Sequence, residues 1–168
     1  YIYMISGENL YIVDAFPAED MRIVSNVTLN GSASNLFVNG DKLVVLMNVY
    51  EESEILDKPL VEIAADMIIA PRSYNVPRTK VVVYDIRDKE DPAQEEEYIF
   101  DGGYMDARMI GDNVYVVSQK YIGGSIGLPR VTIQGVTSEM DLSDVYYSNE
   151  FDESFAFTFV SAIDLENG

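Results

Sequence analysis

Residues 36–50 read LFVNGDKLVVLMNVY, and their two apolar runs flank the turn Asn39-Gly40-Asp41. Asn and Gly tolerate the positive φ angles of a tight hairpin, so this stretch predicts two antiparallel strands. Residues 107–121, ARMIGDNVYVVSQKY, have the same order of apolar run, Gly-Asp turn and apolar run. β-Hairpins are therefore the expected building unit of this chain.

The two hairpins belong to a longer repeat. One constant offset, the one that takes Asp14 to Asp85, aligns the two halves of the chain without a gap, and apolar positions stay in phase. A third, partial copy ends at Asp164 after a longer spacer. The matched residues are Asp14 with Asp85, Glu19 with Glu90, Gly31 with Gly102, Gly40 with Gly111, Val45 with Val116 and Tyr50 with Tyr121.

Each repeat is expected to form four antiparallel strands, which is the blade of a β-propeller. The predicted fold is all-β, a partial β-propeller of four-stranded antiparallel blades, with about two to three blades in these 168 residues. The expected divisions are an incomplete first blade over 1–34, a middle blade over 35–102 with an insertion at 51–78, and an incomplete last blade over 103–168 with an insertion at 122–154.

The two insertions differ in character. The spacing of four apolar residues predicts a short helix between Pro59 and Pro71; they are Val61, Ala64, Ala65 and Ile68. The second insertion is polar and acidic, and Gly123-Gly124-Ser125-Ile126-Gly127 within it is expected to be a flexible spacer, because it lacks the Lys of a phosphate-binding loop. Loops of this length in a compact domain are usually functional or disordered.

Composition excludes several classes of function. The chain has 29 Asp and Glu against 11 Lys and Arg, a net charge of −18, and no His, Cys or Trp. It therefore has no disulfide, no Ser-His or Cys-His pair and no His- or Cys-based zinc, copper or haem site. Its acidity argues against binding to nucleic acid or to anionic membranes. Apolar runs of about five residues are too short for a spanning helix, which needs about 20.

The first residues also lack a signal-peptide pattern, and the chain starts at Tyr1 rather than at a Met. The chain is therefore expected to be part of a longer protein. The sequons at Asn26 and Asn30 permit glycosylation in a secretory context.

Three aspartates, Asp14, Asp85 and Asp164, each end the third strand of a repeat. One hypothesis makes them a ring of carboxylates for a metal ion or a substrate. The favoured interpretation is a turn cap, in which each carboxylate accepts a backbone N–H bond. The repeat requires a turn at this position, which supports the cap.

Asp106 and Arg108 lie two residues apart on a predicted strand and so share a face. On the innermost strand of a blade they would line the central channel and could bind a polar ligand. The favoured interpretation is an internal ion pair or a contact with a neighbouring blade. The matching residues of the middle blade are Asn35 and Phe37, so the pair is not repeated.

Acidic residues also cluster in turns. Asp88, Glu90 and Asp91 could hold calcium through oxygen ligands, but the spacing is not that of an EF-hand and a solvated loop is favoured. The runs Glu51-Glu52 and Glu95-Glu96-Glu97 are interpreted as solvated edges that discourage wrong strand pairing. No residue is assigned as catalytic, cofactor-binding or metal-binding, and calcium stays an alternative.

Several phrases resemble one family. They are the run Lys80–Asp88 followed by Asp91-Pro92, the run Gly103–Val117, and Leu142–Tyr147 followed by Phe157–Leu165. They resemble secreted bacterial and archaeal proteins that carry a β-propeller domain distantly related to WD repeats. The resemblance implies an extracytoplasmic, often membrane-tethered propeller with no assigned catalytic residues.

The expected function is a non-catalytic scaffold or a ligand- or protein-binding module of a secreted or cell-surface protein, with a protein or polysaccharide partner. The alternatives are a carboxylate-dependent hydrolase of carbohydrate or peptide and a divalent-cation-binding surface domain. Because incomplete end blades expose strand edges and apolar faces, this chain is also expected to form homo-oligomers.

Overall fold

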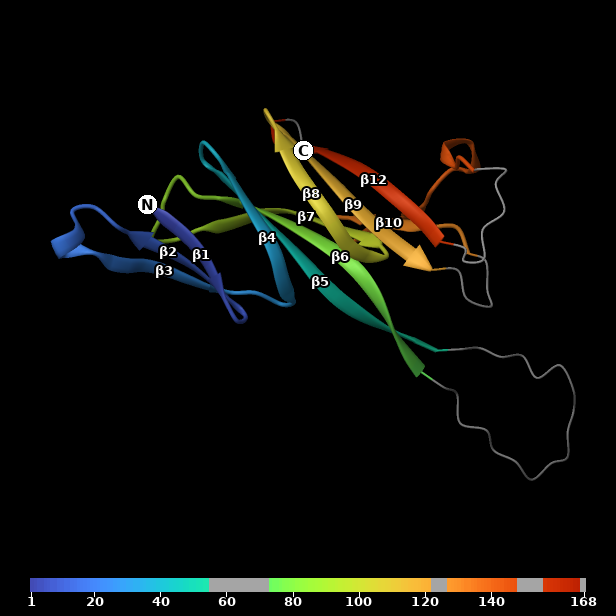
Figure 1. Ribbon diagram of the computed structural model, residues 1–168, viewed down its shortest axis with the longest axis horizontal. Coiled ribbons are helices and arrows are strands. Elements are labelled where there is room, and N and C mark those ends of the chain that lie inside the picture. Colours follow the sequence, from blue (N-terminus) through green and yellow to red (C-terminus); the bar gives the residue numbers. More distant parts are fainter. Residues whose placement is uncertain (55–72, 122–126, 148–155, 167–168) are drawn as a thin grey trace, which may run out of the picture.

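The fold is built from antiparallel β-sheets (Figure 1). The structure, a computed structural model, describes residues 1–54, 73–121, 127–147 and 156–166. Within these residues the strands form three sheets, and the helical segments are the two short 3-10 turns η1 (Ala18–Asp20) and η2 (Leu142–Asp144). The all-β prediction is confirmed.

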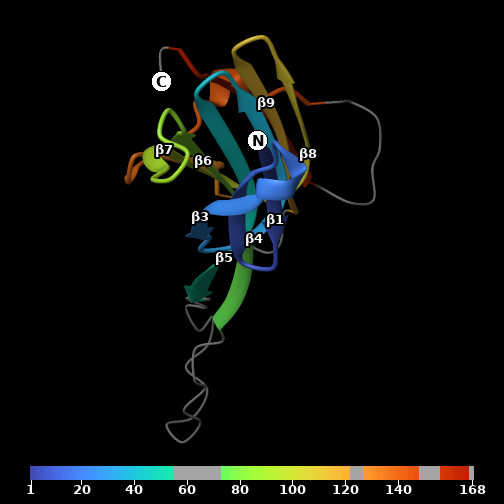
Figure 2. The same cartoon turned by 90° about the vertical axis from the view of Figure 1, so that its left-hand side faces the viewer.

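The first and last sheets have three strands each. The first has the order β1 (Ile2–Ser6), β2 (Asn9–Asp14), β3 (Arg22–Thr28). The last has the order β12 (Ala156–Asp164), β9 (Asn113–Tyr121), β8 (Gly103–Ile110). In Figure 2 the first sheet lies nearest the viewer.

The middle sheet is larger than the four strands predicted. Its order is β11 (Val136–Glu139), β10 (Arg130–Ile133), β7 (Ala93–Asp101), β6 (Ser73–Asp85), β5 (Lys42–Glu54), β4 (Ser32–Asn39). The β10–β11 hairpin comes from the second insertion and pairs with the outer edge of β7, with Val131 opposite Phe100. Its alternating apolar and polar residues suit an edge that β7 would otherwise leave unpaired.

The first insertion is shorter than expected. Pairing of β5 with β6 continues from Glu51 opposite Val76 to Glu54 opposite Ser73, so both strands are 13 residues long. Figure 1 shows this hairpin reaching beyond the other strands of the sheet. The predicted helix between Pro59 and Pro71 and the spacer residues 123–126 lie outside the described residues.

Alternation along β5 builds two cores. Leu43 and Val45 pack with Leu10 and Ile12 of the first sheet, whereas Val44 and its neighbours on the other face pack with the last sheet. Because side chains in a strand point alternately to opposite faces, a strand covered on both sides needs a continuous apolar run. The run Leu43–Met47, at most 1% exposed, meets this need.

Candidate functional site

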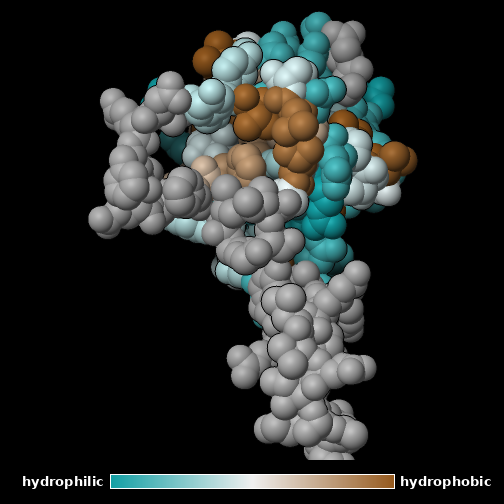
Figure 3. Space-filling view, turned by 90° about the vertical axis from the view of Figure 1, so that its right-hand side faces the viewer, coloured by the Kyte–Doolittle hydropathy of each residue, from teal (hydrophilic) through white to brown (hydrophobic). Residues whose placement is uncertain are grey.

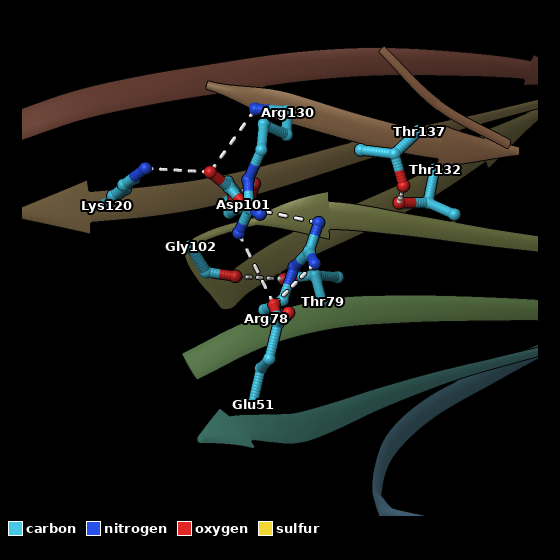
Figure 4. Close-up of polar contacts among 10 residues, drawn as sticks. Glu51, Arg78, Thr79, Asp101, Gly102, Lys120, Arg130, Thr132 and Thr137 are labelled. Carbon is cyan, nitrogen blue, oxygen red and sulfur yellow. Dashed lines mark hydrogen bonds and ion pairs between the residues drawn. The ribbon is translucent and has the colours of Figure 1, made fainter. Parts of the chain in front are cut away.

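Among the described residues, a connected group of charged side chains lies where the last sheet meets the middle sheet at its β10–β11 hairpin (Figure 4). Asp101, at the end of β7, accepts a hydrogen bond from Lys120 Nζ of β9 at 2.7 Å and one from the backbone N–H of Arg130 at 3.2 Å. Arg78 Nη2 of β6 lies 3.1 Å from its Oδ1. Glu51 of β5 completes this group, which is called the Asp101 cluster below.

Glu51 ties two of the cations together. Its Oε2 lies 2.7 Å from Nη1 of Arg78 and 3.4 Å from Nη2 of Arg130. The cluster thus contains three cations and two carboxylates, and it gathers five strands at one point. Arg78 and Asp101 are buried, with side chains 8% and 1% exposed.

The charge state of Asp101 follows from its partners. Burial alone would raise the pKa of this carboxyl, because it disfavours the charged form. The hydrogen bond from Lys120 and the charges of Lys120, Arg78 and Arg130 outweigh burial and hold the pKa below its ordinary value. The carboxylate is therefore ionised near neutral pH and its oxygens are occupied by protein donors, which suits a structural tie.

Glycines permit the close approach around the cluster. Gly102 follows Asp101 with a φ of +91°, and a Cβ there would lie 2.6 Å from the carbonyl carbon of Gln119. Gly31, its counterpart in the repeat, would bring a Cβ within 2.8 Å of Val49 Cγ1. Gly31 connects β3 to β4 and Gly102 connects β7 to β8, so each lies where the chain passes from one sheet to the next and comes close to β5 or β9.

The turn-cap prediction holds for two of the three aspartates. Asp85 Oδ1 accepts a hydrogen bond from the backbone N–H of Arg87 at 2.8 Å, and Asp164 Oδ1 accepts one from Glu166 at 2.9 Å. The side chain and backbone N–H of Arg87 lower the pKa of Asp85 to about 2. Asp14 ends β2 opposite Arg22 and makes no such bond within the described residues. Asp85 and Asp164 thus each cap the turn that follows their own strand.

Asp106 and Arg108 are both exposed on β8 and form no ion pair in the described part of the chain, so the predicted internal pair is wrong. Asp106 instead stabilises a β-bulge, where its Oδ1 accepts the backbone N–H of Ala107 at 2.8 Å. Asn35 does the same for Leu36 at the equivalent bulge of β4. The repeated feature is a short polar acceptor rather than a charge, because a bulge leaves one N–H outside the ladder.

The turn with Asp88, Glu90 and Asp91 is stabilised by a hydrogen bond within the turn. Asp88 Oδ1 accepts the N–H of Glu90 at 2.9 Å, and the Glu90 carboxylate lies 3.2 Å from Arg22 Nη2 of the first sheet. Among the residues that the structure describes, no group of three or more acidic side chains is arranged to hold a metal ion.

The acidic runs are more than solvated edges, which corrects the prediction. Glu51 belongs to the Asp101 cluster, Glu95 pairs with Lys42, and Glu97 lies 2.7 Å from Lys80 Nζ. Glu96 accepts a hydrogen bond from the hydroxyl of Tyr98 at 2.6 Å. Glu52 is exposed as expected. Glu51 and Glu97 thus pair with cations of the adjacent strand β6, Glu95 pairs with a cation of β5, and Glu96 bonds to a hydroxyl of its own strand.

The two sequons occupy different settings. Asn26 lies within β3, and Asn30 lies in the connection from β3 to β4; both are exposed.

Sequence reasoning missed the members of the Asp101 cluster other than Glu51. Their signal was weak but present, because Asp101 and Lys120 are charged residues that flank apolar runs, and Arg130 is the last cation of an acidic stretch. Isolated charges beside predicted core strands are candidates for buried pairs.

The described residues contain no helix long and apolar enough to cross a membrane. Neither the curated proteins nor the solved structures contain a match to this chain. Its sequence does match a protein family, described as Beta propeller domain, over residues 1–168. The stacked antiparallel sheets, the repeat and this match agree, and the chain belongs to the beta propeller domain family.

Proposed function

We propose that this chain is a non-catalytic scaffold and binding module of a secreted or cell-surface protein. The observation that carries the proposal is that the buried charges pair with one another and link strands of different sheets, as a structural role requires. Asp101, saturated by three cations, is the clearest case. A general acid needs a raised pKa, whereas the shifted carboxyls among the described residues, Asp85, Asp101 and Asp141, all have lowered pKa values.

Binding would use outward faces of the sheets. Tyr115 and Val160 occupy the outer face of the last sheet and are 39% and 72% exposed. The repeat matches Tyr115 to Val44 of the middle sheet, which another sheet covers completely. Figure 3, viewed from this end of the molecule, shows apolar side chains grouped at the surface. An exposed apolar stripe of this kind is typical of an interaction surface.

The first sheet has a similar outer face, with Ile2 and Met4 on β1 and Ile23 on β3 exposed. Two copies of this chain can therefore associate head to tail, with the first sheet of one against the last sheet of another. The net charge of −18 opposes this contact. Salt screens it over about 10 Å at about 0.1 M, so association is expected to strengthen as salt rises.

Light scattering across a salt series tests the association. Val160→Glu places a charge in the exposed stripe and is expected to return the protein to monomer, whereas Glu52→Gln is a matched surface control. A wild-type protein that stays strictly monomeric at high protein concentration and high salt would contradict the proposed contact.

The non-catalytic assignment is tested with a panel of glycan and peptide substrates. No turnover is expected, and turnover abolished by a single Asp→Asn or Glu→Gln change would establish a hydrolase instead. A rise in melting temperature with millimolar calcium at constant ionic strength would favour a cation-binding role. The extracytoplasmic location, supported by the family resemblance, is tested by cell fractionation of the full-length protein.

A further inference from the structure

A hollow of about 490 Å³ lies between the β1–β2 turn, the β3–β4 connection and β5. Gly7 and Glu8 of the turn, Asn30 and Gly31 of the connection, and Val49 of β5 line it, together with Tyr50. The backbone carbonyl of Glu8 accepts a hydrogen bond from Leu29 N–H at 2.8 Å, which holds the turn against the connection. Two walls of the hollow, the turn and the connection, are therefore joined to each other.

The repeat relates this hollow to the Asp101 cluster. The offset that takes Asp14 to Asp85 also places Gly7 on Arg78, Asn30 on Asp101 and Val49 on Lys120. The hollow of the first repeat thus corresponds to the Asp101 cluster of the second. In the second repeat, the Arg78 guanidinium lies 3.1 Å from the carboxylate of Asp101, the residue before the connecting glycine Gly102. In the first repeat, the matching residue is Gly7, which has no side chain. In the repeat alignment, the glycine that lines the hollow therefore takes the place of an arginine.

The polar groups around the hollow suit a cation. Glu8 is exposed and, within the described residues, its carboxylate has no Lys or Arg partner. Asn30, which the repeat matches to Asp101, also lines the hollow and carries an amide oxygen as an acceptor. The described residues that line the hollow include no Lys or Arg, so an anionic ligand would meet only like charge from Glu8.

We propose that this hollow receives an arginine side chain from a basic segment of a partner protein. The proposal rests on the proposed binding function and names the class of partner. The planar guanidinium offers five N–H donors, which can bond to the Glu8 carboxylate and the Asn30 amide oxygen together. The net charge of −18 steers a basic partner toward this chain.

The test is a ¹⁵N NMR titration with the capped peptide acetyl-Gly-Arg-Gly-amide. The amide signals of Gly7 and Gly31 are expected to shift first. The lysine peptide is expected to bind more weakly, and the citrulline peptide, which keeps the shape without the charge, not to bind. Glu8→Gln is expected to weaken the arginine peptide about three- to fivefold, in the range of an exposed charge pair.

Two variants complete the test. Glu19→Gln removes an exposed carboxylate from η1, away from the hollow lining, and is expected to leave binding unchanged. Asn30→Asp copies the second repeat and is expected to tighten binding about fivefold or more, because charge-assisted hydrogen bonds are stronger than neutral ones. The spectra of the other amides show directly whether each variant keeps its fold.

Equal effects of Glu8→Gln and Glu19→Gln, equal binding of the citrulline peptide, or no shift at millimolar peptide would overturn the arginine proposal. The proposed scaffold function is judged separately, by substrate turnover and by association through the sheet faces. Failure of the hollow to bind arginine therefore leaves those results untouched, and failure of those results leaves this titration interpretable.

Discussion

Replacing Asp101 by Asn should destabilise the protein more than any change at a surface acid. The carboxylate is 1% exposed and neutralises Arg78, which is itself buried, together with Lys120 and Arg130. Removing one partner of a buried ion pair costs about 3–5 kcal/mol, because the other charge is left without compensation. An Asn side chain retains one acceptor oxygen, so about 3 kcal/mol, the lower end of that range, is expected.

Urea denaturation followed by circular dichroism measures this loss. Thermal denaturation gives a second measure of the same loss. For a chain of this size, a loss of about 1 kcal/mol lowers the melting temperature by about 2–4 °C, so a loss of about 3 kcal/mol should lower it by about 6–12 °C. Hydrogen exchange adds a local measurement. Amides of β10 and β11 should exchange faster, because Asp101 accepts the N–H of Arg130 at the start of the hairpin. Glu52→Gln, at an exposed acid, should change stability by less than about 0.5 kcal/mol.

A loss below about 1 kcal/mol for Asp101→Asn would mean that water already solvates the cluster and that its charges are worth no more than a surface pair. An equal rise in exchange over all strands would refute the local role in docking the hairpin. A double-mutant cycle with Lys120→Met then measures the coupling of the pair directly, and coupling near zero would exclude the 2.7 Å contact as a source of stability.

Other expected outcomes concern acid stability, tight turns and packing. The pKa of Asp85 is lowered from 3.8 to about 2, so the ionised carboxylate stabilises the folded protein above pH about 4, and this contribution is lost as the pH falls toward 2. The difference in urea midpoint between wild type and Asp85→Asn should therefore shrink as the pH falls through this interval. Gly102→Ala should destabilise far more than Gly111→Ala, since a Cβ at Gly102 meets backbone at 2.6 Å and one at Gly111 meets nothing within 4 Å; equal urea midpoints for the two variants would contradict the close crossing. Leu46→Ala, at a side chain with no exposed surface, should cost about 2–5 kcal/mol in the same assay, and a smaller loss would mean that the two-sided core is loosely packed.

Local features of the chain are readable from sequence because short-range physics decides them. The Gly-Asp turns at 40–41 and 111–112 close hairpins whose strands pair as expected. The apolar run Leu43–Met47 lies in a strand as expected, and the structure buries all of its side chains. The repeat then extends one hairpin pattern over the chain, so the class of fold follows from residue type and spacing.

Contacts between residues far apart in sequence are decided only by the tertiary structure. Spacing predicts that Asp106 shares a face with Arg108, and the favoured interpretation from sequence is an internal ion pair or a contact with a neighbouring blade. The bond from Ala107 N–H to Asp106 depends instead on a β-bulge, which strand spacing does not predict. Composition predicts an acidic loop where the structure has the β10–β11 hairpin. The hairpin forms by pairing with β7, with Val131 opposite Phe100. Local sequence does not predict this pairing, because β8 and β9 separate the two partners along the chain.

The Asp101 cluster shows the division most clearly. Hydrophobic periodicity reports which face of a strand is buried, and that signal is summed over many residues of one segment. An ion pair between Glu51 and Arg130 depends instead on where two single side chains end up, 79 positions apart. The repeat and the hairpins thus determined the class of fold, whereas the pairing of the β10–β11 hairpin with β7 and the packing of the last sheet against the middle sheet decided which charges meet.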